Sequence, residues 1–135
     1  MVTTDTEQTI SAPKTFSAGL TSTSSITASG FYQSSDIRLK NVIEPLKVNI
    51  KDILNIPSFY FSYKDKNRVN IGTSAQEVQK VFPEIVSTDS KGTLSVEYDK
   101  FGLIALELIK TQQKEIDSLK YELNNLKLKI DGYRN

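Results

Sequence analysis

The run Ser34-Ser35-Asp36-Ile37-Arg38-Leu39-Lys40 is the strongest candidate for chemistry in this chain of 135 residues. The sequence has no histidine and no cysteine, which excludes a Ser-His-Asp triad, a cysteine nucleophile and metal sites built from imidazole or thiolate ligands. A lysine that is desolvated enough to be neutral is the main remaining base for a serine hydroxyl. Ser35 and Lys40 are therefore the candidate nucleophile and base, and no metal or cofactor is expected.

The spacing of five residues restricts how such a pair can form. Five residues on an α-helix leave two side chains about 140° apart, so Ser35 and Lys40 need a turn at the helix start, or a Lys40 from a neighbouring subunit. The ordinary pKa of a lysine is about 10.4, so a lysine base must also be buried. The local pattern alone favours a structural interpretation, in which Ser35 or Asp36 caps a short helix and Arg38 and Lys40 are solvated.

Other chemistry has weaker support in the sequence. Glu44, Glu77 and Glu84 lie in unrelated local settings, and neither an EF-hand nor a glycine-rich phosphate loop is present. The net charge of +1 provides no field that attracts nucleic acid or anionic lipid. No apolar run approaches the ~20 residues that span a bilayer. We therefore expect neither nucleic acid nor a membrane as a partner.

The composition changes abruptly at Asp36. Residues 1–34 contain 15 Ser or Thr and three charged residues. Short β-prone pieces, punctuated by Gly19 and Gly30, suggest strands, while a disordered linker is the favoured interpretation for a monomer. Three chains that wind together could instead pair these strands between subunits.

Residues 36–98 have the pattern of a compact α+β unit. A short helix is expected at 49–55 and a helix from Ser74 to the residue before Pro83, with Ser74 and Glu77 as a capping box. Alternation predicts a strand at 59–63 and a second one at 69–71. A hairpin is expected from strands at 85–87 and 93–98, with its turn at 89–92.

The last third carries a heptad pattern. The coiled-coil core positions are Ile109, Gln112, Ile116, Leu119, Leu123, Leu126, Ile130 and Tyr133. Glu115 with Lys120, and Glu122 with Lys127, take g and following e positions, which favours parallel chains. Asp99 could cap this helix, and Gly132 lies near its end. The heptads leave the number of chains open.

The motifs, taken in order, resemble one family. The run from Ser35 to Leu46 resembles the start of the C-terminal intramolecular chaperone domain of endosialidase-type phage tailspikes and tail fibres. The resemblance continues through Phe59-x-Phe61-x-Tyr63, Gly72-x-x-Ala75-Gln76-Glu77-Val78, Phe82-Pro83-Glu84-x-Val86, Leu94-x-Val96-x-Tyr98 and the closing helix. It covers about residues 35–130. The last helix departs from the family in having Leu108-Ile109-Lys110-Thr111-Gln112 where Ala-Ile-Lys-Glu-Leu is common.

This resemblance implies a homotrimeric chaperone that assembles a fibre stem and then releases itself. The family's serine and lysine fall on Ser35 and Lys40, and the cleaved bond joins Ser34 to Ser35. Asp36, Arg38 and Gly72 are possible supporting residues: backbone amides near Asp36 or Gly72 are candidate oxyanion donors, and Arg38 is expected to pair with Asp36. The implied partners are two further copies of the chain and the upstream stem.

The expected organisation has three parts. Residues 1–34 are the β-structured end of a stem, residues 35–98 an α+β chaperone core, and residues 99–135 a coiled-coil helix. We expect assembly in the host cytoplasm, after which the stem stays in the virion tail and the chaperone is released. The alternative is a permanent, non-cleaving trimerisation tip, in which Ser35 and Lys40 have only a structural role. A generic coiled-coil partner protein leaves the motifs of residues 35–98 unexplained.

Overall fold

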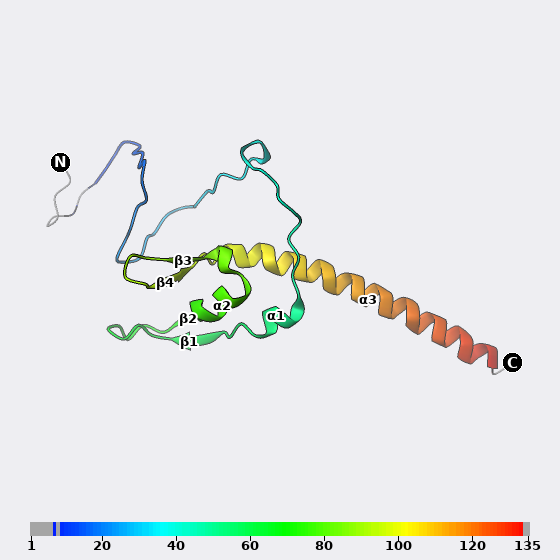
Figure 1. Cartoon of the computed structure of the whole chain (residues 1–135). Helices are drawn as coiled ribbons and strands as arrows, with labels where there is room; N and C mark the ends of the chain where they lie inside the picture. Colours follow the sequence, from blue (N-terminus) through cyan, green and yellow to red (C-terminus); the bar gives the residue numbers. More distant parts are fainter. Residues whose placement is uncertain (1–6, 8, 134–135) are drawn as a thin grey trace. The chain divides into compact units, whose positions relative to one another are not determined.

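The structure is a computed structural model that describes residue 7 and residues 9–133. The chain divides into two compact units, Met1–Asn41 and Val42–Asn135. The first unit contains the Ser/Thr-rich segment and the candidate Ser-Lys pair. The second unit contains every α-helix and β-strand of the described residues (Figure 1).

Within the first unit, residue 7 and residues 9–36 form neither helix nor strand, and all of them are exposed. The one regular element described in this unit is a 3-10 helix, η1, at Ile37–Leu39. The predicted short strands are therefore not formed in the single chain. A strand needs a hydrogen-bonding neighbour and a face to bury, and the described part of this unit has neither. Strand pairing between three chains stays a prediction.

The second unit confirms the predicted mixed α+β class. Its elements are α1 (Ile50–Leu54), β1 (Phe59–Phe61), β2 (Asn70–Gly72), α2 (Ala75–Val81), the 3-10 helix η2 (Pro83–Ile85), β3 (Val86–Thr88), β4 (Leu94–Val96) and α3 (Lys100–Tyr133). Each predicted helix and strand of this unit is present. β1 and β4 are shorter than predicted, and β2 and β3 are each shifted by one residue.

Two antiparallel hairpins form the β-structure. In the first, Tyr60 of β1 is paired with Ile71 of β2. In the second, Ser87 of β3 is paired with Ser95 of β4. The second hairpin turns where the sequence predicts: Gly92 has φ +82°, and the Asp89 carboxylate accepts hydrogen bonds from the backbone amides of residues 91 and 93, each 2.8 Å long. These amide bonds, that of residue 93 first, lower the pKa of Asp89.

The short helices begin at side-chain caps. Asn49 accepts a hydrogen bond from the Lys51 amide at the start of α1 (2.9 Å). Ser74 accepts one from the Glu77 amide at the start of α2 (3.4 Å). The predicted capping box forms only on this side, because the Glu77 carboxylate binds the Lys80 ammonium at 2.8 Å. As predicted, α2 ends before Pro83.

The core of a single chain is very small. Among the described residues the buried hydrophobic side chains are Val78 of α2, with no exposed surface, and Ile104 of α3, at 5% exposure. Phe61 of β1 is half-buried. A domain with so little buried apolar surface has a small hydrophobic contribution to its stability.

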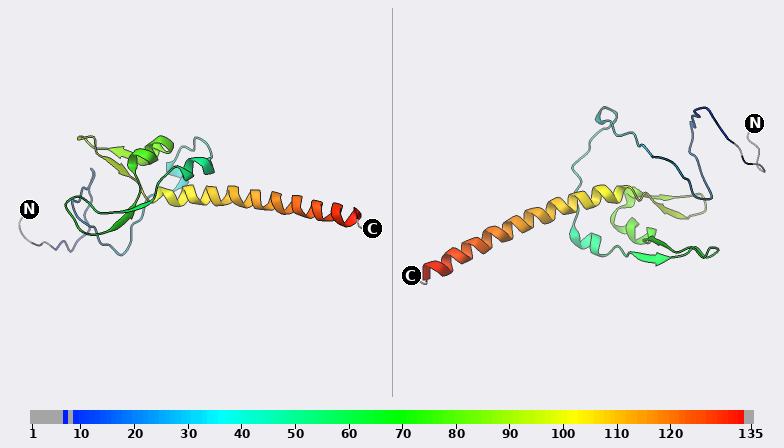
Figure 2. Two further views of the ribbon diagram at one scale, coloured as in Figure 1. Left: turned by 90° about the horizontal axis from the view of Figure 1, so that it is seen from below. Right: turned by 180° about the vertical axis from the view of Figure 1, so that it is seen from behind.

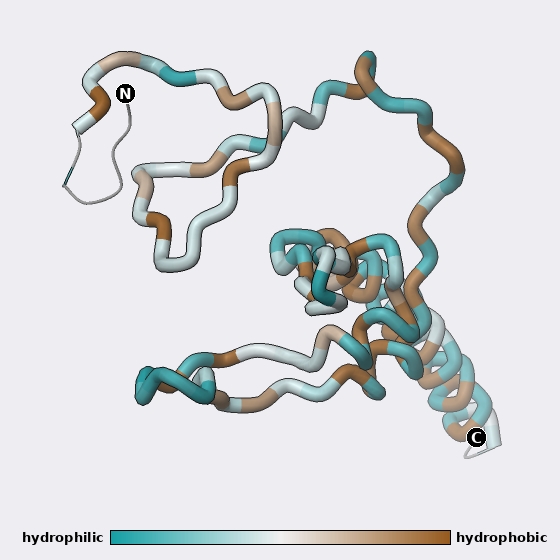
Figure 3. Tube along the Cα trace, turned by 60° about the vertical axis from the view of Figure 1, so that its left-hand side comes forward, coloured by the Kyte–Doolittle hydropathy of each residue, from teal (hydrophilic) through white to brown (hydrophobic). Residues whose placement is uncertain are grey.

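The helix α3 continues well beyond the hairpins and the short helices (Figures 1 and 2). It spans 34 residues without interruption, and hydrophobic and hydrophilic residues alternate along it (Figure 3). Asp99 directly precedes the helix, and its carbonyl oxygen accepts a hydrogen bond from the Gly102 amide (3.2 Å). In residue 7 and residues 9–133, no helix is both long and apolar enough to cross a membrane.

Candidate functional site

The candidate site lies on a tight turn around η1. Asp36 is the N-cap: its carboxylate accepts a hydrogen bond from the Arg38 amide (2.9 Å). The turn is closed by two backbone bonds of 3.1 Å, from the Leu39 amide to the Asp36 carbonyl and from the Lys40 amide to the Ile37 carbonyl. The polypeptide then leaves the turn in an extended conformation at Lys40.

This turn brings the two ends of the motif together. The Lys40 ammonium group donates a hydrogen bond of 2.7 Å to the Ser35 hydroxyl oxygen. The contact forms within one chain, so a neighbouring subunit is not needed to bring the two groups within hydrogen-bond distance. The predicted turn therefore exists. The structural interpretation holds for Asp36, which caps the short helix. Ser35 does not cap it and contacts Lys40 instead.

Asp36 and Arg38 form a second pair in the same turn. The Arg38 Nε lies 3.1 Å from each oxygen of the Asp36 carboxylate, and a terminal nitrogen of Arg38 contacts one of them. These contacts lower the pKa of Asp36 and raise the pKa of Arg38. The pairing predicted for Arg38 is confirmed, and both charges are matched without involving Lys40.

The whole turn is open to water in the single chain. Ser34, Ser35 and Lys40 are exposed, and the Arg38 side chain is 84% exposed. A lysine acts as a base in its neutral form, and solvation by water favours the charged form. The geometry of a serine-lysine pair is thus present in the single chain, whereas a desolvated environment for it is not.

Gly72 lies in the second unit, so its predicted role near Ser35 is not tested. The structure does explain why this position is a glycine. A Cβ atom at Gly72 would lie 2.8 Å from a ring carbon of Phe61 and 2.8 Å from the Tyr98 hydroxyl oxygen. The same Tyr98 hydroxyl accepts a hydrogen bond of 3.2 Å from the Thr73 amide. Sequence reasoning missed this contact, because nothing local links positions 25 residues apart.

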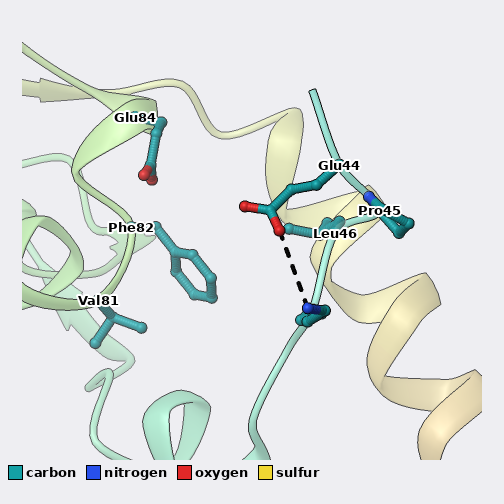
Figure 4. Close-up of a pocket in the computed structure, with 7 residues that line it drawn as sticks. Glu44, Pro45, Leu46, Val81, Phe82 and Glu84 are labelled. Atoms are coloured by element: carbon teal, nitrogen blue, oxygen red, sulfur yellow. Dashed lines mark ion pairs between the residues drawn. The ribbon is translucent and has the colours of Figure 1, made fainter. Parts of the chain in front are cut away.

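The second unit has a pocket of about 360 Å³. It is lined by Glu44, Pro45, Leu46, Lys47, Val81, Phe82 and Glu84. Figure 4 shows Val81, Phe82 and Glu84 on one side, with Glu44, Pro45 and Leu46 on the other. Glu44 and Glu84 lie in unrelated local settings in the sequence, and the fold brings both to one pocket. Glu44 is also 3.9 Å from Lys47, while Glu77 is paired with Lys80 on α2.

The predicted coiled-coil positions lie on α3 and are open to solvent. The exposed fractions are 60% for Ile109, 45% for Ile116, 58% for Leu119, 52% for Leu123, 55% for Leu126, 56% for Ile130 and 92% for Tyr133. Gln112 is also exposed. The helix is confirmed, and its pairing with other copies stays a prediction. The side chains left uncovered are those that a coiled coil would bury.

A comparison with known proteins finds a family match for part of the chain. Residues 35–87 match the model of a peptidase family, S74, described as the chaperone of endosialidase. The matched segment begins at Ser35 and includes Lys40, both hairpin strands β1 and β2, and α2. For this segment the match supports the endosialidase-type chaperone domain that the sequence motifs resemble. No curated protein sequence matches the chain.

Proposed function

We propose that the chain is an intramolecular chaperone that assembles three copies of a phage fibre stem and then cuts itself free between Ser34 and Ser35. The family match supports a chaperone role. The observation that carries the cleavage is the hydrogen bond of 2.7 Å between the Lys40 ammonium group and the Ser35 hydroxyl. It joins a hydroxyl that can serve as nucleophile to an amine that can serve as base without an imidazole or a thiol.

The proposed reaction takes place within one chain. Lys40, in its neutral form, accepts the hydroxyl proton while the Ser35 oxygen attacks the carbonyl carbon of Ser34. A C–O bond forms, the C–N bond between the two residues breaks, and the Ser35 nitrogen receives a proton. Water then hydrolyses the ester, which leaves a carboxylate on Ser34 and restores the Ser35 hydroxyl. The attacking and scissile groups are adjacent in the chain, so proximity favours the step.

Assembly is the proposed switch for this reaction. The exposed apolar face of α3 suits a parallel coiled coil of three chains, in which Glu115 faces Lys120 and Glu122 faces Lys127 of the next chain. We propose that trimerisation shields the turn around η1 from water. Desolvation favours a neutral lysine, so cleavage follows assembly. An unassembled chain that cleaves at the full rate would contradict this order.

The biological setting follows from the same proposal. Residues 1–34 are the end of the fibre stem, and three copies supply the neighbouring strands that the single chain lacks. Assembly takes place in the host cytoplasm, the stem enters the virion tail, and residues 35–135 are released. The partners are two further copies and the upstream stem, with no nucleic acid, membrane or cofactor involved.

One observation favours a second function, a permanent trimerisation tip. Asp36 does cap η1, as expected if the motif is only structural. In that case the Lys40 contact to Ser35 is a further stabilising bond of the turn, and the chain stays intact after assembly. The two functions differ in the fate of one peptide bond.

The deciding experiment measures the intact mass of the assembled protein. The proposal predicts two fragments, residues 1–34 and residues 35–135, in the wild type and in the Ser34→Ala control. Ser35→Ala, which removes the nucleophile, should leave a single full-length chain with the same oligomeric state. Full-length wild type after complete assembly would refute cleavage and favour the permanent tip.

A further inference from the structure

The Asp36–Arg38 pair lies beside the serine-lysine pair and is not used in the reaction above. Asp36 is four residues from Lys40 in sequence and one residue from Ser35. Its carboxylate caps the turn and also binds the Arg38 guanidinium through two nitrogens. The charged groups of the turn are Asp36, Arg38 and Lys40; Glu7 and Lys14 are the others in the described part of this unit.

A free carboxylate at this position would oppose the chemistry. An anion near a lysine favours the charged ammonium form and offers it a stronger hydrogen-bond partner than a neutral hydroxyl. In the structure the carboxylate is held by Arg38, and Lys40 contacts Ser35 instead. An arginine serves this purpose well, because its guanidinium stays charged and engages a carboxylate with two nitrogens at once.

We propose that Arg38 is a positioning residue that sequesters the Asp36 carboxylate, so that Asp36 can cap the turn without capturing Lys40 from Ser35. The inference rests on the proposed cleavage. It assigns a distinct role to each residue of the turn: Ser35 attacks, Lys40 takes the proton, Asp36 holds the backbone, and Arg38 keeps the cap from competing for the base. The lowered pKa of Asp36 is in line with a carboxylate that is already matched.

The role predicts an unusual pattern of substitutions. Arg38→Ala should slow cleavage by about three- to tenfold and move the pH of half-maximal rate upward, because the freed carboxylate stabilises the charged lysine. Asp36→Asn/Arg38→Ala should cleave faster than Arg38→Ala, since the amide oxygen can still cap the turn without a charge. If Arg38 only stabilised the fold, the second change could not restore the rate.

The cleavage test uses the full chain, refolded by dilution from denaturant at a series of pH values. Intact mass follows the loss of the full-length chain, and sedimentation confirms that each variant assembles. Recovery of rate and pH midpoint in Asp36→Asn/Arg38→Ala supports the proposal. A double variant no faster than Arg38→Ala overturns it.

A second readout does not depend on cleavage. In the non-cleaving Ser35→Ala chain, the Asp36 carboxyl titration is followed by carbon NMR with and without Lys40→Gln. The proposal predicts that Lys40→Gln changes this titration only when Arg38→Ala is also present. If Lys40→Gln changes the Asp36 titration equally with and without Arg38→Ala, the sequestering role is refuted. A wild type that never cleaves, combined with the predicted NMR pattern, would refute the proposed function and leave the role of Arg38 intact.

Discussion

The turn around η1 and the helix α3 differ in whether their side chains find contacts within one chain. The turn spans a few residues, and its side chains find their partners inside one chain: Asp36 with Arg38, and Lys40 with Ser35. The helix spans 34 residues, yet its predicted coiled-coil seam, from Ile109 onward, is exposed in the single chain. The difference fits the proposed control of cleavage, in which each chain builds its own reacting groups and assembly supplies the burial.

The largest effect is expected from replacing Lys40, the proposed general base. Lys40→Gln keeps the length of the side chain but cannot accept the serine proton, so the cleavage rate should fall by at least about 100-fold. The rate is measured by intact mass during refolding. Lys47→Gln is the matched control, because Lys47 is also exposed and lies 3.9 Å from a carboxylate. A Lys40→Gln chain that cleaves like the control would show that Lys40 is not the base.

The next effect tests the helix. Leu119→Asp/Leu123→Asp places charges on the predicted seam, where the two leucines are 58% and 52% exposed in the single chain. Sedimentation should show loss of the trimer, and cleavage should fall by at least about tenfold because the turn stays hydrated.

The control for the helix is Tyr121→Asp/Leu128→Asp. These side chains are as apolar and are 69% and 70% exposed, but they lie on the outer face of the heptad pattern. The trimer and the cleavage rate should be retained. Equal damage from both pairs would show that α3 does not assemble through the predicted seam.

A smaller effect concerns the packing inside the second unit. Gly72→Ala would place a methyl group 2.8 Å from Phe61 and from Tyr98, and should lower the free energy of unfolding by about 1–3 kcal/mol. Gly102→Ala, with no atom within 4 Å, should instead stabilise α3 by about 0.5–1 kcal/mol. Thermal unfolding measures both changes. A neutral Gly72→Ala would show that this contact relaxes at no cost.

The smallest effect is a pH dependence of the β3–β4 hairpin. The amides of residues 93 and 91 lower the pKa of Asp89 from its ordinary value of 3.8. The stabilisation is therefore present above pH 3.8 and is lost as the pH falls through the lower pKa of the folded state. Asp89→Asn should remove this part of the acid sensitivity, as seen in amide exchange of the hairpin between pH 5 and pH 2. An unchanged acid profile would contradict the assignment.

The sequence predicts those features that residues close together in the chain determine. Ser74, Pro83 and the Asp89–Gly92 turn mark element ends by their own side chains, and the structure has the elements there. The serine-lysine contact needed only a turn that Asp36 could cap. By contrast, the pocket shared by Glu44 and Glu84 depends on the tertiary fold. The fit of Gly72 against Tyr98 does so too, and no local pattern encodes either contact.

Two features stay predictions: strand pairing in residues 1–34 and the coiled-coil seam of α3. The predicted strands of residues 1–34 and the predicted seam of α3 both involve partners from other chains. In the single chain, residue 7 and residues 9–34 form no strand, and the seam is exposed. Backbone pairing and burial between chains are quaternary properties, which the periodicity of one chain does not encode.

The central claim is that Ser35 and Lys40 of the same chain act together in cleavage. A mixed assembly of two variants tests it most directly. Ser35→Ala chains retain the base and Lys40→Gln chains retain the nucleophile, and the two are refolded together, with wild type plus Lys40→Gln as the control. In the control, only the wild-type chains should be cut. The account predicts that neither chain is cut in mixed trimers of the two variants. Cleavage of Lys40→Gln chains there would show that the lysine acts between subunits and would contradict the account.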